Sequence, residues 1–145
     1  MPEFVAQHVP PGLDEFTTGY LEAVEWLLPE QTDAGGAIIG PPPRDTLQGF
    51  APAFLAEAEA DCADFQEQHA ADLERYVELT RRTMSGAGVD FWLTRNGHGA
   101  GFWDRGTDPV FERLTAAAKV YGGVDIEVAE NLITTAWRDI PRAVA

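Results

Sequence analysis

The stretch DFWLTRNGHGAGFWDRG, residues 90–106, decides the fold that this sequence predicts. Residues 91–95 and 100–105 are rich in aromatic side chains, which is typical of β-strands. Asn96-Gly97 lies between them and supplies the positive φ angles of a tight turn. We therefore expect a β-hairpin here. Its faces are shared by Phe91, Leu93 and Phe102 on one side and by Trp92 and Trp103 on the other.

Three segments around this hairpin carry apolar residues at steps of three and four, the spacing of amphipathic helices. Thr17 or Thr18 can cap the first helix, and Asp108 can cap the last. Pro52 suits the first turn of the second helix, which we expect to be long and continuous. The three predicted helices are residues 16–28, 52–82 and 109–121.

A second hairpin is predicted near the end of the chain. Residues 124–128 alternate strictly between apolar and polar side chains, and residues 132–137 follow after a turn at 129–131. The prediction is an α+β fold, a single domain in which three α-helices pack on an antiparallel sheet of two β-hairpins. The predicted parts are an N-terminal arm (1–13), the domain (14–137) and a C-terminal tail (138–145).

Residues 29–52 form a long predicted loop, since they hold five prolines and four glycines. A loop of this length is either a flexible linker or a functional lid, and the sequence leaves both interpretations open. Ile38 and Ile39 are its adjacent bulky apolar pair, and we expect them to pin the loop to the core.

Composition excludes several classes of protein. The 145 residues hold 24 acidic and 10 basic side chains, giving a formal net charge of −14. An isoelectric point near 4.3 argues against direct binding to nucleic acid, which requires clustered Lys and Arg. With neither a signal-peptide pattern nor a long apolar run, we expect a cytoplasmic protein that does not contact the membrane. The lone Cys62 lies on the apolar stripe of the long helix and is expected to be buried and inert.

The tip of the first hairpin is a candidate for a small-ligand or catalytic site. It gathers Arg95, Asn96, His98, Asp104 and Arg105 within a few residues. His98 can act as a general acid or base near neutral pH, with Asp104 or Asp90 orienting it or binding a cation. The alternative is a scaffold, with ordinary turn residues, a solvated histidine and internally paired arginines. The scattered histidines fit no metal-ligand spacing, and we expect no metal and no cofactor.

Trp92 and Trp103 allow a further set of interpretations. A helix that covers this face of the hairpin explains both indoles as core. An exposed pair would instead give an aromatic binding platform, or would be buried between copies of the chain. A monomer and a small homo-oligomer both remain open.

The residues of the long helix opposite its apolar stripe are strongly acidic. Arg75 is the one cation among them before Arg81 and Arg82. The acidic positions are Glu57, Glu59, Asp61, Asp64, Glu67, Asp72, Glu74 and Glu78. Such a surface is either a solvated helix face or a binding face for basic proteins, and a net negative charge steers the molecule toward basic clefts. Its charge density, about one per 6 Å along the helix, is below the one per about 1.7 Å of duplex DNA, so mimicry of DNA needs further carboxylates.

The residue 90–106 motif, together with three further stretches, resembles a family of small acidic proteins encoded by bacteriophages and prophages. The further stretches are FTTGYLEAVEWLL (16–28), CADF (62–65) and RLTAAAKVYGGVDIEV (113–128). The chain departs from the family in the Gly/Pro-rich insertion around 33–49 and after Val128. The resemblance implies a genetic context and no known activity: a phage accessory or host-takeover product inside a bacterial cell.

These observations lead to one expected function and two alternatives. We expect a non-enzymatic binding protein that engages a basic host or defence protein through its acidic surface, with nucleic-acid mimicry as one mode of inhibition. The first alternative is an enzyme or small-ligand-binding protein centred on the 95–105 hairpin. The second is a homo-oligomeric structural protein.

Overall fold

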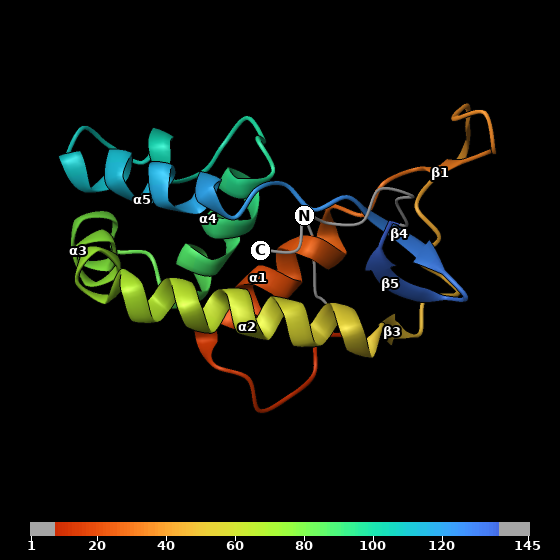
Figure 1. Ribbon diagram of the computed structural model, residues 1–145, viewed down its shortest axis with the longest axis horizontal. Helices are drawn as coiled ribbons and strands as arrows, with labels where there is room; N and C mark the ends of the chain where they lie inside the picture. Colours follow the sequence, from red (N-terminus) through yellow and green to blue (C-terminus); the bar gives the residue numbers. More distant parts are fainter. Residues whose placement is uncertain (1–7, 137–145) are drawn as a thin grey trace.

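The computed structural model describes residues 8–136, and these hold a helical body with a small sheet at one end (Figure 1). The helices are α1 (Glu15–Trp26), α2 (Pro52–Gln68), α3 (Ala70–Thr80), α4 (Met84–Arg95), the short 3-10 helix η1 (Phe102–Asp104) and α5 (Pro109–Val120). The strands are β1 (Gln31–Thr32), β2 (Ile38–Gly40), β3 (Gly49–Phe50), β4 (Ile126–Ala129) and β5 (Leu132–Thr135). The α+β class is confirmed, whereas the number and arrangement of the elements differ from the prediction.

The central contact of the helical body is the crossing of α1 and α4. It is made by glycines: a Cβ atom added to Gly88 would overlap the carbonyl oxygen of Phe16, and one added to Gly19 would overlap the carbonyl oxygen of Ser85. Backbone therefore lies directly against backbone. The large side chains on either side of this contact interdigitate as a result.

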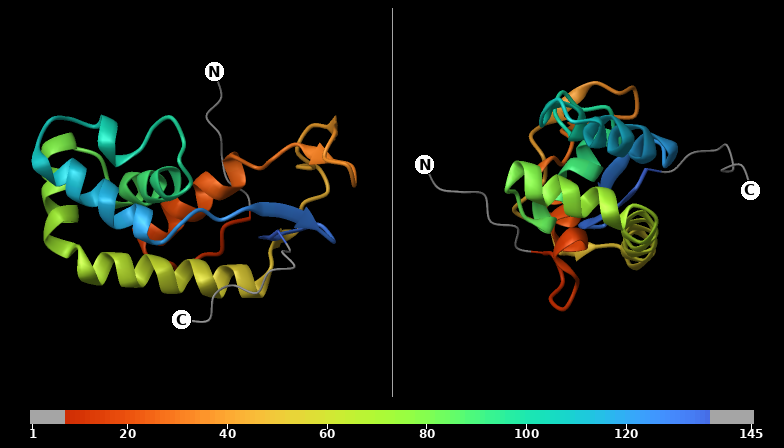
Figure 2. Two further views of the ribbon diagram at one scale, coloured as in Figure 1. Left: turned by 45° about the horizontal axis from the view of Figure 1, so that its top comes forward. Right: turned by 90° about the vertical axis from the view of Figure 1, so that its left-hand side faces the viewer.

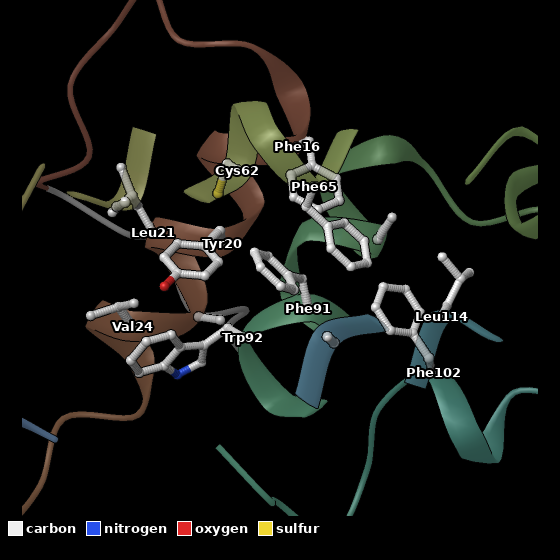
Figure 3. Close-up of a cluster of buried hydrophobic side chains, with 14 of the residues drawn as sticks. Phe16, Tyr20, Leu21, Val24, Cys62, Phe65, Phe91, Trp92, Phe102 and Leu114 are labelled. Atoms are coloured by element: carbon white, nitrogen blue, oxygen red, sulfur yellow. The ribbon is translucent and has the colours of Figure 1, made fainter. Parts of the chain in front are cut away.

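An aromatic core forms around the crossing (Figure 3). The rings of Phe65 and Phe91 stack with centroids 4.3 Å apart, and Tyr20 meets Trp92 edge-on at 5.2 Å. Phe102 stacks on Phe65 at 5.9 Å. Side chains from the five α-helices and from η1 thus fill one continuous core, which explains why residues far apart in sequence are fully buried together.

The first predicted hairpin is wrong, because residues 84–95 are helical. Gly97 has a positive φ of 70° but Asn96 has a φ of −97°, and together they end a helix instead of forming a hairpin turn. The amide of His98 donates to the carbonyl of Leu93 at 3.0 Å and that of Gly97 to Thr94 at 3.2 Å, the pattern of a Schellman cap. Trp92 and Trp103 consequently do not share a face: Trp92 is 2% exposed and Trp103 is 50% exposed.

The predicted long helix is two helices that meet at His69 (Figure 2). His69 has φ −125° and ends the regular hydrogen bonding of α2, although neither glycine nor proline marks the position. Packing accounts for the turn in direction. It brings Tyr76 against Phe102 and Phe111, with ring centroids 5.5 Å and 6.3 Å apart, so that α3 lies beside α5 instead of extending into solvent.

The sheets also correct the prediction. β4 and β5 form the expected antiparallel hairpin, with Glu130 and Asn131 both at positive φ in its turn. The third strand, β3, comes from the predicted loop and pairs parallel to β5. The three-stranded sheet is therefore mixed and lies next to the start of α2, and no hairpin of residues 91–105 contributes to it.

The 29–52 segment contains the strands β1, β2 and β3, and its two isoleucines do not anchor it to the core. β1 and β2 form a small hairpin that projects from the body (Figure 1), and Ile38 and Ile39 are 63% and 64% exposed. Leu47 and Phe50 are buried in their place. Arg44 fastens the segment to α1, since its guanidinium donates to the carbonyl of Glu25 at 2.8 Å.

Caps explain most of the remaining helix boundaries. Asp14, instead of Thr17 or Thr18, caps α1 by accepting from the amide of Thr17 at 2.8 Å. Asp108 caps α5 as predicted, accepting from Val110 at 2.9 Å. The first seven residues of the predicted arm, Trp137 and the predicted tail lie outside the described residues.

Substitution of Gly88 tests the glycine crossing. We expect Gly88→Ala to lower the free energy of unfolding by at least about 2 kcal/mol, because its Cβ meets rigid backbone of α1. Urea denaturation measures this change. Gly86→Ala in the same helix is the control: its Cβ meets only the Arg82 side chain, at 3.2 Å, and alanine favours the helix, so we expect no loss of stability. Equal losses in the two variants would contradict the close crossing.

Candidate functional site

The residues predicted to form a site at the tip of the first hairpin do not converge on one place. Arg95 and Arg105 turn inward to different parts of the core. Asn96 accepts from the amide of Val124 at 2.7 Å and so holds the segment that leads into β4. His98 is exposed, and Asp104 accepts from the amide of Gly101 at 3.1 Å. The scaffold interpretation therefore accounts for Arg95, Asn96, Asp104 and Arg105.

Arg95 is a buried hub between four helices. Its guanidinium donates to the carbonyl oxygens of Tyr121 at 3.0 Å and Gly122 at 2.8 Å, which satisfies the C-terminal end of α5. It also pairs with the Asp61 carboxylate of α2 at 2.8 Å and donates to the hydroxyl of Tyr20 at 3.2 Å. Its charge is therefore balanced by contacts within the fold.

Asp90 is the second buried hub, and it is fully excluded from solvent. Arg105 binds it through two atoms, with Nη2 2.6 Å and Nε 2.9 Å from the two carboxylate oxygens. The hydroxyl of Tyr76 donates to it as well, and Arg82 donates to that hydroxyl at 2.7 Å. Burial and the adjacent carboxylate raise the pKa of Tyr76, so the phenol keeps the proton that it donates.

The central residues of both hubs, Arg95 and Asp90, are buried. Cys62 is completely buried, as predicted, and burial raises the pKa of its thiol. His69 packs its ring 4.8 Å from that of Phe65. Within residues 8–136, no group of three or more His, Cys, Asp or Glu side chains is placed to hold a metal ion.

The acidic residues of α2 and α3 fall into two sets. One set has partners inside the fold: Asp61 pairs with Arg95, Asp72 with Arg113 at 2.9 Å, and Glu78 with Arg75 at 2.9 Å. Asp64 also belongs here, since hydrogen bonds from Tyr121 and Gln68 lower the pKa of its carboxyl. Glu59, Glu67 and Glu74 form the second set, and all three are exposed.

An apolar groove that includes Glu74 in its lining lies in the corner where α2 turns into α3. Its volume is about 330 Å³. Its lining residues come from the end of α2, from one side of α3 and from the start of α4, and are Gln66, Ala70, Leu73, Glu74, Val77 and Met84. The groove depends on the turn at His69, which no local pattern in the sequence predicts. The spacing of Ala70, Leu73 and Val77 was the available signal.

The candidate site is therefore the outer side of α2 and α3, formed by Glu59, Glu67 and Glu74 together with the groove. We call this the α2–α3 surface. Glu57, although it is exposed on α2, has an interaction within the fold and is left out of the definition.

The scaffold role of Asp90 is testable by substitution. We expect Asp90→Asn to lower the free energy of unfolding by about 3 kcal/mol, since the partly buried Arg105 guanidinium loses the charge of the carboxylate that it binds through two atoms. Denaturation of His98→Ala supplies the comparison. The His98 side chain is exposed, and we expect a change within about 0.5 kcal/mol. A stable Asp90→Asn variant would contradict the assignment of Asp90 as a structural hub.

The accessibility of Cys62 is a second test. We expect the native protein at pH 8 to react with a thiol reagent such as DTNB at least about a hundredfold more slowly than the urea-unfolded chain, because the thiol is buried and its pKa is raised. Absorbance of the released thiolate measures the rate. Rapid reaction of the folded protein would show that the core opens at α2 or that the thiol is reactive after all.

Comparison with known proteins finds no match: no protein-family model, curated protein or solved structure matches the chain. The candidate site therefore rests on the geometry and chemistry of its own residues.

Proposed function

We propose that this protein is a non-enzymatic binding protein that engages a basic protein partner through the α2–α3 surface. The observation that carries the proposal is that several arginines are ion-paired within the fold, whereas carboxylates of α2 and α3 are exposed. Within residues 8–136, ion pairs with carboxylates of the fold are made by the arginines Arg75, Arg82, Arg95, Arg105 and Arg113. The excess of carboxylates is left to dominate the outside.

The distribution of these pairs favours a protein partner over mimicry of a nucleic acid. Asp61, Asp64, Asp72 and Glu78 are neutralised or hydrogen-bonded internally, which thins the row of charge along α2 and α3. A regular phosphate-like array is therefore less supported than a set of separate carboxylates beside an apolar surface. Protein interfaces combine apolar centres with polar rims in this way.

The cellular setting is part of the proposal. The resemblance of residues 90–106 to small acidic phage and prophage proteins implies an accessory or anti-defence product that acts in the cytoplasm of a bacterial host. Among the described residues, the helices are too short or too polar to cross a membrane. A basic host or defence protein is the partner class that this setting and the charge support together.

Neutralising the exposed carboxylates tests the proposal. A combined Glu59→Gln, Glu67→Gln and Glu74→Gln variant is expected to bind the partner about tenfold more weakly at low salt, because it loses the attraction of the α2–α3 surface. Bacterial lysate supplies the partner at about 50 mM salt, and titration of the identified protein then measures affinity as salt is raised to screen exposed charges.

A matched variant removes the same charge elsewhere. Glu30, Glu127 and Glu130 are exposed around the sheet end of the molecule, and their joint change to Gln is expected to weaken binding less than about threefold. Equal weakening by the two variants would mean that only overall charge matters. Failure of the unmodified protein to retain any basic protein at low salt would overturn the proposal.

A further inference from the structure

The lining of the groove in the corner of α2 and α3 is largely apolar. Leu73 in this lining is 1% exposed, and Val77 and Met84 are half-buried. The small side chain of Ala70 leaves the corner unfilled. A volume of about 330 Å³ is at the lower end of the range for ligand sites and accommodates a few anchoring side chains.

The edges of the groove are polar and carry negative charge toward the α2 end. Glu74 is part of the lining and is exposed. Gln66, also in the lining, donates to the Asp14 carboxylate at 3.2 Å, which places a second acid beside the groove. Hydrogen bonds from Thr17 and Gln66 outweigh the effect of burial and lower the pKa of Asp14, so this acid is ionised at neutral pH.

The arginines of α3 and of the turn after it are not among the residues that line the groove. Arg82 points inward to Tyr76 and Asp90, and Arg75 pairs with Glu78 and Asp108. Arg81 is exposed at the C-cap of α3, the end away from α2. The charged side chain in the lining of the groove is therefore the carboxylate of Glu74.

We propose that the groove binds an amphipathic basic helix of a protein partner, with apolar side chains on Leu73, Val77 and Met84 and lysines or arginines beside Glu74 and Asp14. The inference rests on the proposed function and names the partner's binding element. Complementarity of charge selects the basic sequence, and spaced apolar anchors of a helix fit a groove of this size. Met84 is suited to such a wall, since methionine adapts its shape to different side chains.

The test uses a synthetic helix and a signal from the groove itself. The probe is a peptide of about 15 leucines and lysines with leucines at three- and four-residue spacing, long enough to form a helix on binding. The chain has two methionines, so a ¹³C-methyl label gives a simple NMR spectrum, in which Met84→Leu assigns the Met84 signal. We expect this signal to shift and saturate with the helical peptide, and to respond weakly to a peptide of the same composition with leucine and lysine alternating.

Two charge variants locate the binding. Glu74→Lys is expected to weaken peptide binding about tenfold, whereas Glu127→Lys in β4, which changes the net charge equally but lies outside the α2–α3 surface, is expected to weaken it less than about threefold. Both side chains are exposed, so both variants are expected to fold. Circular dichroism checks this.

The outcomes separate the groove from the wider proposal. Binding without a shift of Met84 overturns the groove as the binding place and leaves the acidic surface supported. Equal weakening by Glu74→Lys and Glu127→Lys also overturns the groove, since only overall charge would then matter. Equal binding of the alternating peptide overturns a helix as the occupant. A Met84 shift that depends on protein concentration alone identifies a second copy of the chain instead. No binding of either peptide overturns the inference, while the proposed function still depends on its own glutamine variants.

Discussion

The contact of backbone with backbone where α1 crosses α4 is the constraint on which the other parts of the structure depend. Gly19 and Gly88 allow an approach that any larger side chain would prevent. Because the helices are so close, Phe16, Tyr20 and Phe91 form a single aromatic layer. α2 adds Phe65 to this layer and α5 leads into Tyr121, whose ring meets Phe91 at 5.2 Å. Two residues without side chains thus determine where the largest side chains meet.

The same packing determines how the molecule uses its charge. Arg95 and Arg105 are held at the core by Asp61 and Asp90 and by carbonyl oxygens at the end of α5. A buried guanidinium requires such partners, since an uncompensated buried charge is strongly destabilising. The fold therefore draws cations inward from a chain that has few of them. Each such pair removes one charge of each sign, so the excess of carboxylates that the composition provides is left for the outside. This excess connects the architecture to the binding function that we propose.

The sequence predicted the elements whose signals are local. α1, α5 and the β4–β5 hairpin have regular apolar spacing, and the Asp108 cap was identified. α4 was missed because its buried side includes Ala87, Gly88, Thr94 and Arg95, which do not register as an apolar stripe. Asn96-Gly97 fits a helix cap as well as a hairpin turn. The parallel pairing of β3 with β5 joins distant segments, and no local pattern encodes it.

For the candidate site, composition predicts which residues are acidic, and the three-dimensional structure decides which of them are exposed. Composition identified the carboxylates of α2 and α3, but only the structure separates Asp61 and Asp72, which have internal partners, from Glu59 and Glu74, which are exposed. The groove depends on the turn at His69, since a straight helix would carry Leu73 and Val77 away from Met84. The aromatic contacts that pull α3 toward α5 therefore also create the apolar corner beside Glu74. The packing of α3 against α5 therefore contributes both to the fold and to the surface that we assign to binding.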